Sequence, residues 1–162
     1  MSKSEKKKKS KTVQVSSSII VGRPLDIVWS TVGDPEKDPL YMSDKERVRV
    51  LPGTLDGDVA KIETEMTFGI TGAHQSVTTD LVEQSDTRLV IQGSAVGPGI
   101  KSMREVREVE AVRDTTRFTL TIAMDFTGLF AKVPTRLLLK KLQTRADSRV
   151  DAARDFIEKS SR

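Results

Sequence analysis

The chain has 162 residues, of which 36% are hydrophobic and 31% are charged, so one globular domain with a substantial core is expected. It contains no cysteine and a single histidine, which excludes disulfides, cysteine nucleophiles, thiolate metal sites and multi-histidine metal sites. No apolar run in the sequence approaches the ~18 residues that a membrane-spanning helix needs.

The net charge of +4 arises from the N-terminal tail and not from the body of the chain. Residues 1–12 hold six lysines and one glutamate, whereas the rest of the chain holds 21 basic and 22 acidic residues. Like charges without an apolar segment cannot offset the entropy of ordering, so we predict that residues 1–11 form a disordered Lys-rich tail. The tail also lacks the apolar stretch of a secretory signal, and we expect a cytoplasmic protein.

Two roles fit such a tail. It either keeps the protein soluble without a specific partner, or it makes weak electrostatic contact with polyanions or a membrane surface. No aromatic residue is interleaved with the lysines to stack on bases. We therefore favour the solubilising role and expect no specific nucleic-acid partner.

The first part of the domain predicts one strand followed by two short helices. Residues 12–21 alternate between polar and apolar positions, as a half-buried strand does. A helix is predicted over 25–32, because Pro24 suits its first turn and the apolar residues recur at helical spacing. Residues 36–45 predict a second short helix or an ordered loop.

The middle of the chain predicts six further strands, because short alternating segments are separated by glycine, proline and aspartate turn residues. They cover residues 48–51, 58–70, 74–83, 87–95, 100–112 and 117–126. Sequential strands with short turns predict an antiparallel meander. The facing of strand 100–112 stays open: Met103 and Val109 have one parity and Val106 has the other, which a bulge would reconcile.

The last segment, residues 129–158, is the one long stretch with an unbroken helical period. Its apolar residues form a single stripe: Leu138, Leu142, Ala146, Val150, Ala153 and Ile157. We interpret Lys132, Arg136, Lys140 and Arg145 as part of its solvent-facing side, with contact to lipid phosphates as the alternative. Because an amphipathic helix must bury its stripe, the sequence predicts an α+β fold in which a curved seven-stranded antiparallel sheet wraps around this helix.

The order of these elements resembles the START-like, or Bet v 1-like (SRPBCC), superfamily, and within it the polyketide cyclase/dehydrase and lipid-transport branch. Four stretches carry the resemblance: VSSSIIVGRPLDIVWSTVGDPEKDPLY, GDVAKIETEM, GPG and LLLKKLQTRADSRVDAARDFI. The resemblance covers residues 12–160 and implies a helix-grip fold with a single domain over 12–162. Many members carry a tryptophan where this chain has Tyr41. Since the family has no common catalytic motif, the resemblance implies a pocket rather than a reaction.

The residues predicted to face inward combine apolar side chains with small and hydroxyl-bearing ones. This lining suits a site for an apolar molecule, and a packed core with satisfied hydroxyls fits the same residues; the resemblance favours the site. The predicted ligand-binding residues are Tyr41, Ile62, Thr64, Met66, Phe68, Val77, Thr79, Ile91, Met103, Leu120, Met124 and Leu138.

No catalytic residue is predicted. His74 has the parity opposite to the apolar residues of its strand, which indicates a surface position and not the base of a serine triad. Glu63 and Glu65 lie on the polar face of an amphipathic strand and are interpreted as solvated charges.

Four charged residues lie on the strand whose facing stays open: Arg104, Glu105, Arg107 and Glu108. A buried arginine or glutamate there would orient a polar ligand group or act as a general acid or base. Cross-strand salt bridges on a solvent-facing side are the preferred interpretation.

The leading hypothesis is therefore the binding or carriage of a small hydrophobic ligand, such as a lipid or a polyketide-like molecule, in an internal cavity. Neither a cofactor nor a metal is predicted. One alternative is a cyclase/dehydratase-type enzyme acting on such a ligand, and a second is a regulatory protein whose basic tail contacts an acidic partner. Inward-facing titratable side chains would favour the enzyme over the carrier.

Overall fold

The computed structural model of the protein describes residues 10–42, 47–50, 61–68, 73–95 and 99–160. Within these ranges, side chains are described for residues 10–42, 82–93 and 99–160. Among the described residues, no helix is long and apolar enough to cross a membrane.

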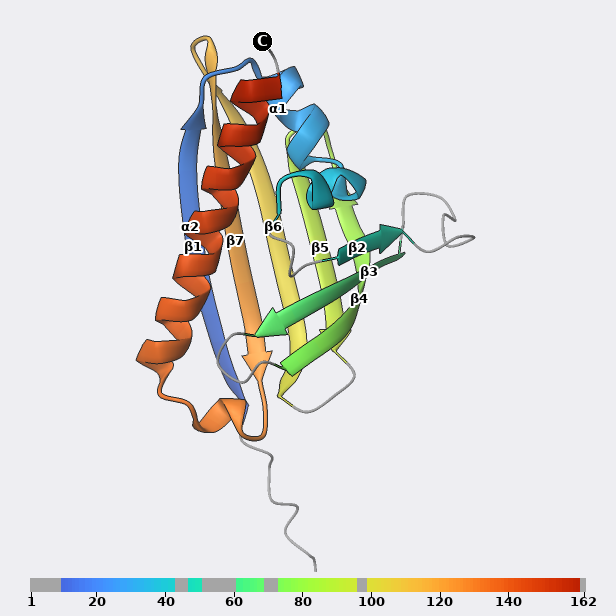
Figure 1. Ribbon diagram of the computed structural model, residues 1–162, viewed down its shortest axis with the longest axis vertical. Coiled ribbons are helices and arrows are strands. Elements are labelled where there is room, and N and C mark those ends of the chain that lie inside the picture. The colour runs from blue at the N-terminus through green and yellow to red at the C-terminus, as the bar shows by residue number, and fades with distance from the viewer. Residues whose placement is uncertain (1–9, 43–46, 51–60, 69–72, 96–98, 161–162) are drawn as a thin grey trace, which may run out of the picture.

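The chain forms one antiparallel sheet and one long helix, with short helical segments between them (Figure 1). The strands are β1 (Lys11–Val21), β2 (Arg47–Val50), β3 (Lys61–Phe68), β4 (Ala73–Gln84), β5 (Arg88–Ala95), β6 (Ile100–Val112) and β7 (Thr115–Phe126). The helical segments are α1 (Leu25–Val32), the 3-10 helices η1 (Pro35–Leu40) and η2 (Phe130–Lys132), and α2 (Thr135–Ser160).

The sheet follows the order β1-β7-β6-β5-β4-β3-β2, with every neighbouring pair antiparallel. The predicted meander therefore extends from β2 to β7, while β1 crosses over to pair with β7, the last strand of the chain. The α+β class, the antiparallel sheet and the long C-terminal helix agree with the sequence prediction, in a helix-grip-like arrangement.

Two helix boundaries differ from the prediction. The second short helix is the 3-10 helix η1, whose Asp34 cap accepts a hydrogen bond from the Glu36 backbone N–H at 3.0 Å. The long helix begins at Thr135 and not at Leu129, because Pro134 disfavours helical geometry in the residue before it. Residues 127–134 instead form a turn that contains η2.

The face of the sheet on which α2 packs, called the inner face below, carries the main hydrophobic core. Figure 1 shows α2 lying over β1 and β7 and running in the same direction as β1. The six apolar residues of the predicted α2 stripe are all buried, which confirms the helical phase. They join Val13, Val15 and the inward residues of β7 in one cluster.

Polar side chains of α2 also form hydrogen bonds with β1, the strand at the edge of the sheet. The Gln143 amide donates to the Ser16 carbonyl oxygen at 3.0 Å, and the Ser17 hydroxyl donates to Asp147 at 2.6 Å. At the end of the strand the Gly22 backbone N–H donates to Glu158 at 2.9 Å. Contacts of this kind along the strand fix the position of α2 against β1.

The register settles which way β6 faces. Met103 and Val109 are buried and pair with Met124 and Phe118, whose side chains are also buried, so the odd-numbered residues of β6 lie on the inner face. Val106 therefore lies on the opposite face. The register shift falls at the start of β6, between Ile100 and Ser102, and does not separate Val106 from its neighbours.

Cross-strand pairs arrange inner-face positions in rows, since directly opposed residues in an antiparallel pair share a face. One row crosses six strands through Val13, Met124, Met103, Gly93, Thr79 and Ile62. In a neighbouring row Val77 pairs with Thr64 and with Ala95. The first row thus passes from large apolar residues on β1, β7 and β6 to a glycine and a threonine on β5 and β4.

Candidate functional site

A network of buried charged residues lies on the inner face of β6, with Arg107 at its centre. The Arg107 guanidinium donates to both carboxylate oxygens of Asp38, at 2.7 and 2.6 Å, and to the Val32 carbonyl oxygen at 3.1 Å. It also donates through Nε and Nη2 to Glu105, at 3.0 and 2.9 Å. These five bonds use all five N–H groups of an arginine. Arg107 therefore joins α1, η1 and β6 at one point.

Glu105 links this network to the long helix. Its second carboxylate oxygen accepts a hydrogen bond from Arg149 on α2 at 2.5 Å. Burial alone would raise the pKa of the Glu105 carboxyl, but the adjacent Arg107 and Arg149 guanidinium groups hold that pKa below its usual value. Glu105 is therefore ionised at neutral pH. Burial opposes the charge of Arg107 as well, yet Asp38 and Glu105 raise its pKa above the usual value.

Tyr41 closes the network on the side of η1. Its hydroxyl donates to Asp38 at 2.9 Å, and its ring packs on Phe156 of α2 with a centroid separation of 5.9 Å. Burial raises the pKa of the Tyr41 phenol far above its usual range, with Arg107 opposing this rise and Asp38 adding to it. Tyr41 therefore stays a neutral hydrogen-bond donor.

Arg145 lies one turn before Arg149 on α2 and is not on the solvent-facing side of the helix as predicted. Its side chain is partly buried. Burial, followed by repulsion from Arg149, lowers the pKa of Arg145 to about 9, so the side chain still carries its charge at neutral pH. The interpretation of Arg145 as part of a solvent-facing basic row was wrong because its position on the helix adjoins the buried stripe, three residues after Leu142.

Local sequence explains how Asp38 reaches Arg107. Pro35 begins η1 and Pro39 lies within it, so prolines fix two backbone torsions of this short segment. The backbone N–H groups of Tyr41 and Met42 donate to the Asp38 carbonyl oxygen at 3.2 and 2.8 Å. The Asp38 side chain is then held facing the sheet and is only 2% exposed.

The interpretation of Glu105 and Arg107 as solvent-facing residues was wrong, since they are 4% and 2% exposed. A signal was available in the sequence, because both share the parity of Met103 and Val109. Asp38 and Arg149 had no comparable signal. Asp38 sits in a polar segment, and Arg149 sits among the charged residues of an amphipathic helix.

The predicted ligand-binding residues fall into three groups. Four of them are part of the packed core beneath α2: Met103, Leu120, Met124 and Leu138. Ile91 is buried on β5 opposite Glu105, and Tyr41 packs against the core at its edge. For the other six the structure describes backbone positions on β3 and β4: Ile62, Thr64, Met66, Phe68, Val77 and Thr79.

The register brings part of this set together across the sheet. Ile62 and Thr79 share the cross-strand row of Met103 and Met124, and Ile91 occupies the inner-face position of β5 next to Gly93. Their role in binding remains a prediction. The side chains of His74, Glu63 and Glu65 lie outside the described part of the structure. Within the part that is described, no group of three or more histidine, aspartate or glutamate side chains could hold a metal ion.

Comparison with solved structures shows the same fold in other proteins. A protein from Thermus thermophilus matches with a TM-score of 0.78 at 16% identity, over 93% of this chain and 100% of that one. A START superfamily protein from Mycobacterium smegmatis matches with a TM-score of 0.72 at 15% identity, over 91% and 98% of the two chains. The Zhui aromatase/cyclase from Streptomyces sp. R1128 matches with a TM-score of 0.69 at 14% identity, over 94% and 97%.

No curated protein matches the sequence significantly. The family described as "Polyketide cyclase / dehydrase and lipid transport" matches residues 12–154, which is most of the chain. This match and the structural neighbours confirm the START-like resemblance read from the sequence. The chain belongs to the polyketide cyclase/dehydrase and lipid-transport family.

Proposed function

We propose that the chain binds and carries a small, largely apolar molecule on the inner face of β3, β4 and β5, beside the Arg107 network. The family supports ligand binding or cyclase-type function and specifies no substrate. Glycine and threonine occupy the centre of the cross-strand row there, so little side-chain volume is contributed from these positions. The buried core residues Met103 and Met124 would form one wall of such a site.

The observation that carries this proposal is the state of the ionisable groups in the network. The pKa of Glu105 is lowered and the pKa of Tyr41 is raised, so both groups titrate farther from neutrality than usual. A general acid or base works best when its pKa is near the working pH. These groups therefore suit a fixed electrostatic environment that orients a polar part of the ligand, and they suit proton transfer poorly.

A cyclase/dehydratase-type enzyme is the second candidate. It is favoured by the burial of ionisable side chains beside the inner face, since perturbed groups in such positions often mark reactive sites. In that case Glu105 and Arg149, which meet at 2.5 Å, would contact the reacting atoms. The carrier is preferred because each of these groups already forms an ion pair within the protein.

We further propose that residues 12–162 act as a single domain in the cytoplasm and that residues 1–11 serve as a charged extension of it. Lys11, the last residue assigned to that extension, is also the first residue of β1, and its ammonium donates to the Val133 carbonyl oxygen at 2.8 Å.

The test is native mass spectrometry of the full chain purified from its own host, followed by identification of any molecule retained. We expect an apolar molecule with one polar group that is released unchanged after incubation with the protein. Conversion of the molecule, abolished by Glu105→Gln, would establish the enzyme instead. The absence of both a retained molecule and any binding of a hydrophobic dye to the folded protein would contradict either function.

A further inference from the structure

The turn between β7 and α2 holds a leucine in solvent. Leu129 is 80% exposed, the highest value among the large hydrophobic side chains that the structure describes. Gly128, near the start of the turn, has a positive φ of 62°, a conformation that glycine adopts without steric cost. Phe130, the next residue, is only 7% exposed and packs on Phe126 with a centroid separation of 6.1 Å.

This exposure is a consequence of an ordered turn. The Thr127 backbone N–H donates to the Gly99 carbonyl oxygen at 2.9 Å, and the Lys132 backbone N–H donates to the Leu129 carbonyl oxygen at 3.1 Å. Gly99 is also in close contact with the Phe130 ring, which a Cβ at that position would overlap. Since Phe130 is anchored on one side of the turn, Leu129 is held on the other side, in solvent.

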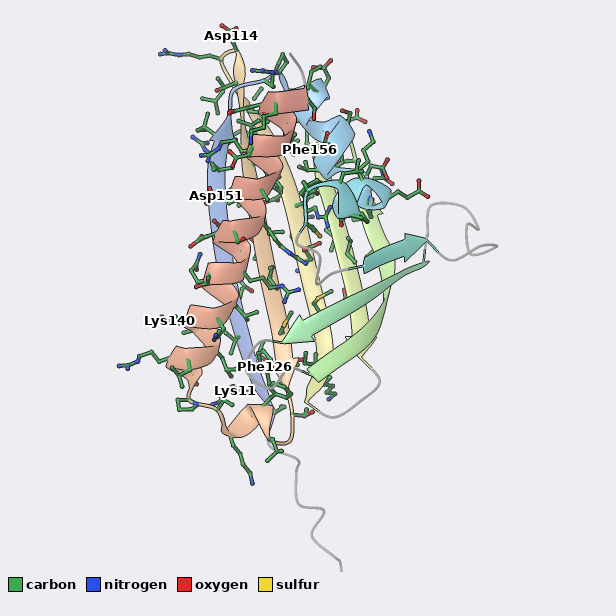
Figure 2. All side chains as sticks on the ribbon, viewed as in Figure 1. Lys11, Asp114, Phe126, Lys140, Asp151 and Phe156 are labelled. Carbon is green, nitrogen blue, oxygen red and sulfur yellow. The ribbon has the colours of Figure 1, made fainter. Side chains whose placement is uncertain are left out.

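The residues around Leu129 are basic. Residues 126–146 contain five lysines and arginines and no acidic residue, whereas residues 147–160 contain four acidic and three basic residues. Lys140 is exposed, and Figure 2 shows it pointing away from the sheet. The first turn of α2 has no acidic residue, although the helix dipole favours acidic residues there. This charge pattern is therefore not explained by helix stability.

We propose that this end of the molecule docks on an anionic lipid bilayer, with Leu129 and the 47% exposed Leu137 entering the interface and Lys132, Arg136 and Lys140 facing lipid headgroups. Exposed leucines flanked by basic side chains are the pattern of interfacial membrane binding. A nucleic acid would complement the charges, but it would not account for the exposed leucines.

The N-terminal tail adds to the same charge. Lys11 lies at this end of the sheet, where its ammonium donates to the Val133 carbonyl oxygen at 2.8 Å (Figure 2). The nine residues that precede Ser10 in the sequence include five lysines and one glutamate. The tail is thus attached beside the proposed docking surface, and its charge would strengthen attraction to the same anionic bilayer.

The experiment measures binding of the full chain to vesicles of phosphatidylcholine with phosphatidylserine, against vesicles of phosphatidylcholine alone. We expect binding that requires phosphatidylserine and weakens as salt is raised. Leu129→Ser should weaken it about tenfold, equal to ~1.4 kcal/mol, as expected for loss of a buried leucine side chain. Lys140→Gln should weaken it about fivefold, the equivalent of ~1 kcal/mol per basic side chain at an anionic surface.

Two matched variants serve as controls. Leu40→Ser changes a leucine that is 62% exposed on η1, and Lys159→Gln changes an exposed lysine in the last turn of α2, so both should bind like the parent chain. The proposal is overturned if the full chain does not bind these vesicles. It is also overturned if Leu129→Ser binds normally, or if a short RNA displaces the vesicles and binds independently of Leu129, since the surface would then be a general polyanion site.

Discussion

The two halves of the inner face are built from different residues. Under α2, Leu142 and Val150 share a cluster with Val15 and Ile122 of β1 and β7, and each of these four side chains is at most 6% exposed. On β5 and β4, the cross-strand row instead contains Gly93 and Thr79. The half under α2 is therefore a packed apolar core, whereas the other half carries smaller residues at Gly93 and Thr79.

The Arg107 network lies where these two halves meet. Buried ion pairs often contribute little net stability, because the cost of removing charges from water offsets their attraction. We interpret its role as positioning secondary-structure elements. One guanidinium joins Val32 at the end of α1, Asp38 in η1 and Glu105 on the sheet. It thereby fixes α1 and η1 at the border between the two halves.

The largest effect on stability is expected from a charge placed in the half of the inner face under α2. Leu142→Asp should destabilise the protein by about 4 kcal/mol or more, because an aspartate would be buried there without a partner. Urea unfolding measures the change. Lys141→Asp, on the exposed side of the same helix turn, should change the free energy of unfolding by no more than about 0.5 kcal/mol. Equal losses in the two variants would show that α2 does not pack as described.

A smaller loss of stability is expected when the Arg107 network is broken. Arg107→Met should cost about 3–5 kcal/mol, because it leaves the buried carboxylates of Asp38 and Glu105 without their main partner. Adding Asp38→Leu to this variant should recover part of the loss, since one buried charge is removed. If the double variant is as unstable as the sum of the two single variants, the residues are not energetically coupled.

Replacing one methionine by tryptophan in each half of the inner face compares the packing of the two halves directly. Met124→Trp should cost roughly 1–3 kcal/mol, because Met124 is 1% exposed in a packed core. Met66→Trp on β3 should leave the stability of the ligand-free protein unchanged or raised and should reduce binding of a hydrophobic dye. Thermal unfolding and dye binding are measured on both variants. Equal destabilisation of both, without dye binding by the parent chain, would mean that the two halves are packed alike.

A change of pH tests the burial of Tyr41 in the Arg107 network, because Tyr41 is the one tyrosine in the sequence. Its raised pKa means that its contribution to stability is complete below the ordinary value of 10.0 and is lost as the pH rises above it, since the unfolded chain then ionises first. In native protein, tyrosinate absorbance should stay absent until the protein unfolds, whereas urea-unfolded protein should titrate near the ordinary value. A native titration at that ordinary value would place Tyr41 in water.

The smallest effect is expected from the tail. Deleting residues 2–9 should leave the melting temperature nearly unchanged, because β1 begins only at Lys11. Thermal unfolding of the full and shortened chains provides the comparison. A large loss of stability would show that the tail packs on the folded domain and would change the boundary proposed for it.

Much of the fold could be predicted because its signals are local. The α2 stripe from Leu138 to Ile157 is visible in the sequence, since a helix buries residues at a fixed spacing. Alternation likewise predicts β7. The start of the helix was misplaced because Phe130 and Val133, two apolar residues of the turn, were interpreted as an extension of the stripe, although they precede Pro134.

The candidate site could not be predicted in the same way, because its partners are far apart in the chain. Arg107 is separated by 69 residues from Asp38, and Glu105 by 44 from Arg149. The charged residues of β6 fit either a solvent-exposed face of the sheet or a buried network until the register with β7 is known. Only the combination of sheet register and helix position shows that these four residues meet.

The pairing of β1 with β7 and α2 has a consequence for synthesis of the chain. β1 ends at Val21, yet its partner strand spans Thr115–Phe126, and the helix that packs on it ends at Ser160. β1 therefore cannot form its pairing with β7 until residues 115–126 have been synthesised and have left the ribosome. During that time its unpaired edge is available to other chains, as are transiently exposed strands in general. Folding of the sheet should thus be completed only once β7 and α2 have been synthesised and reach β1.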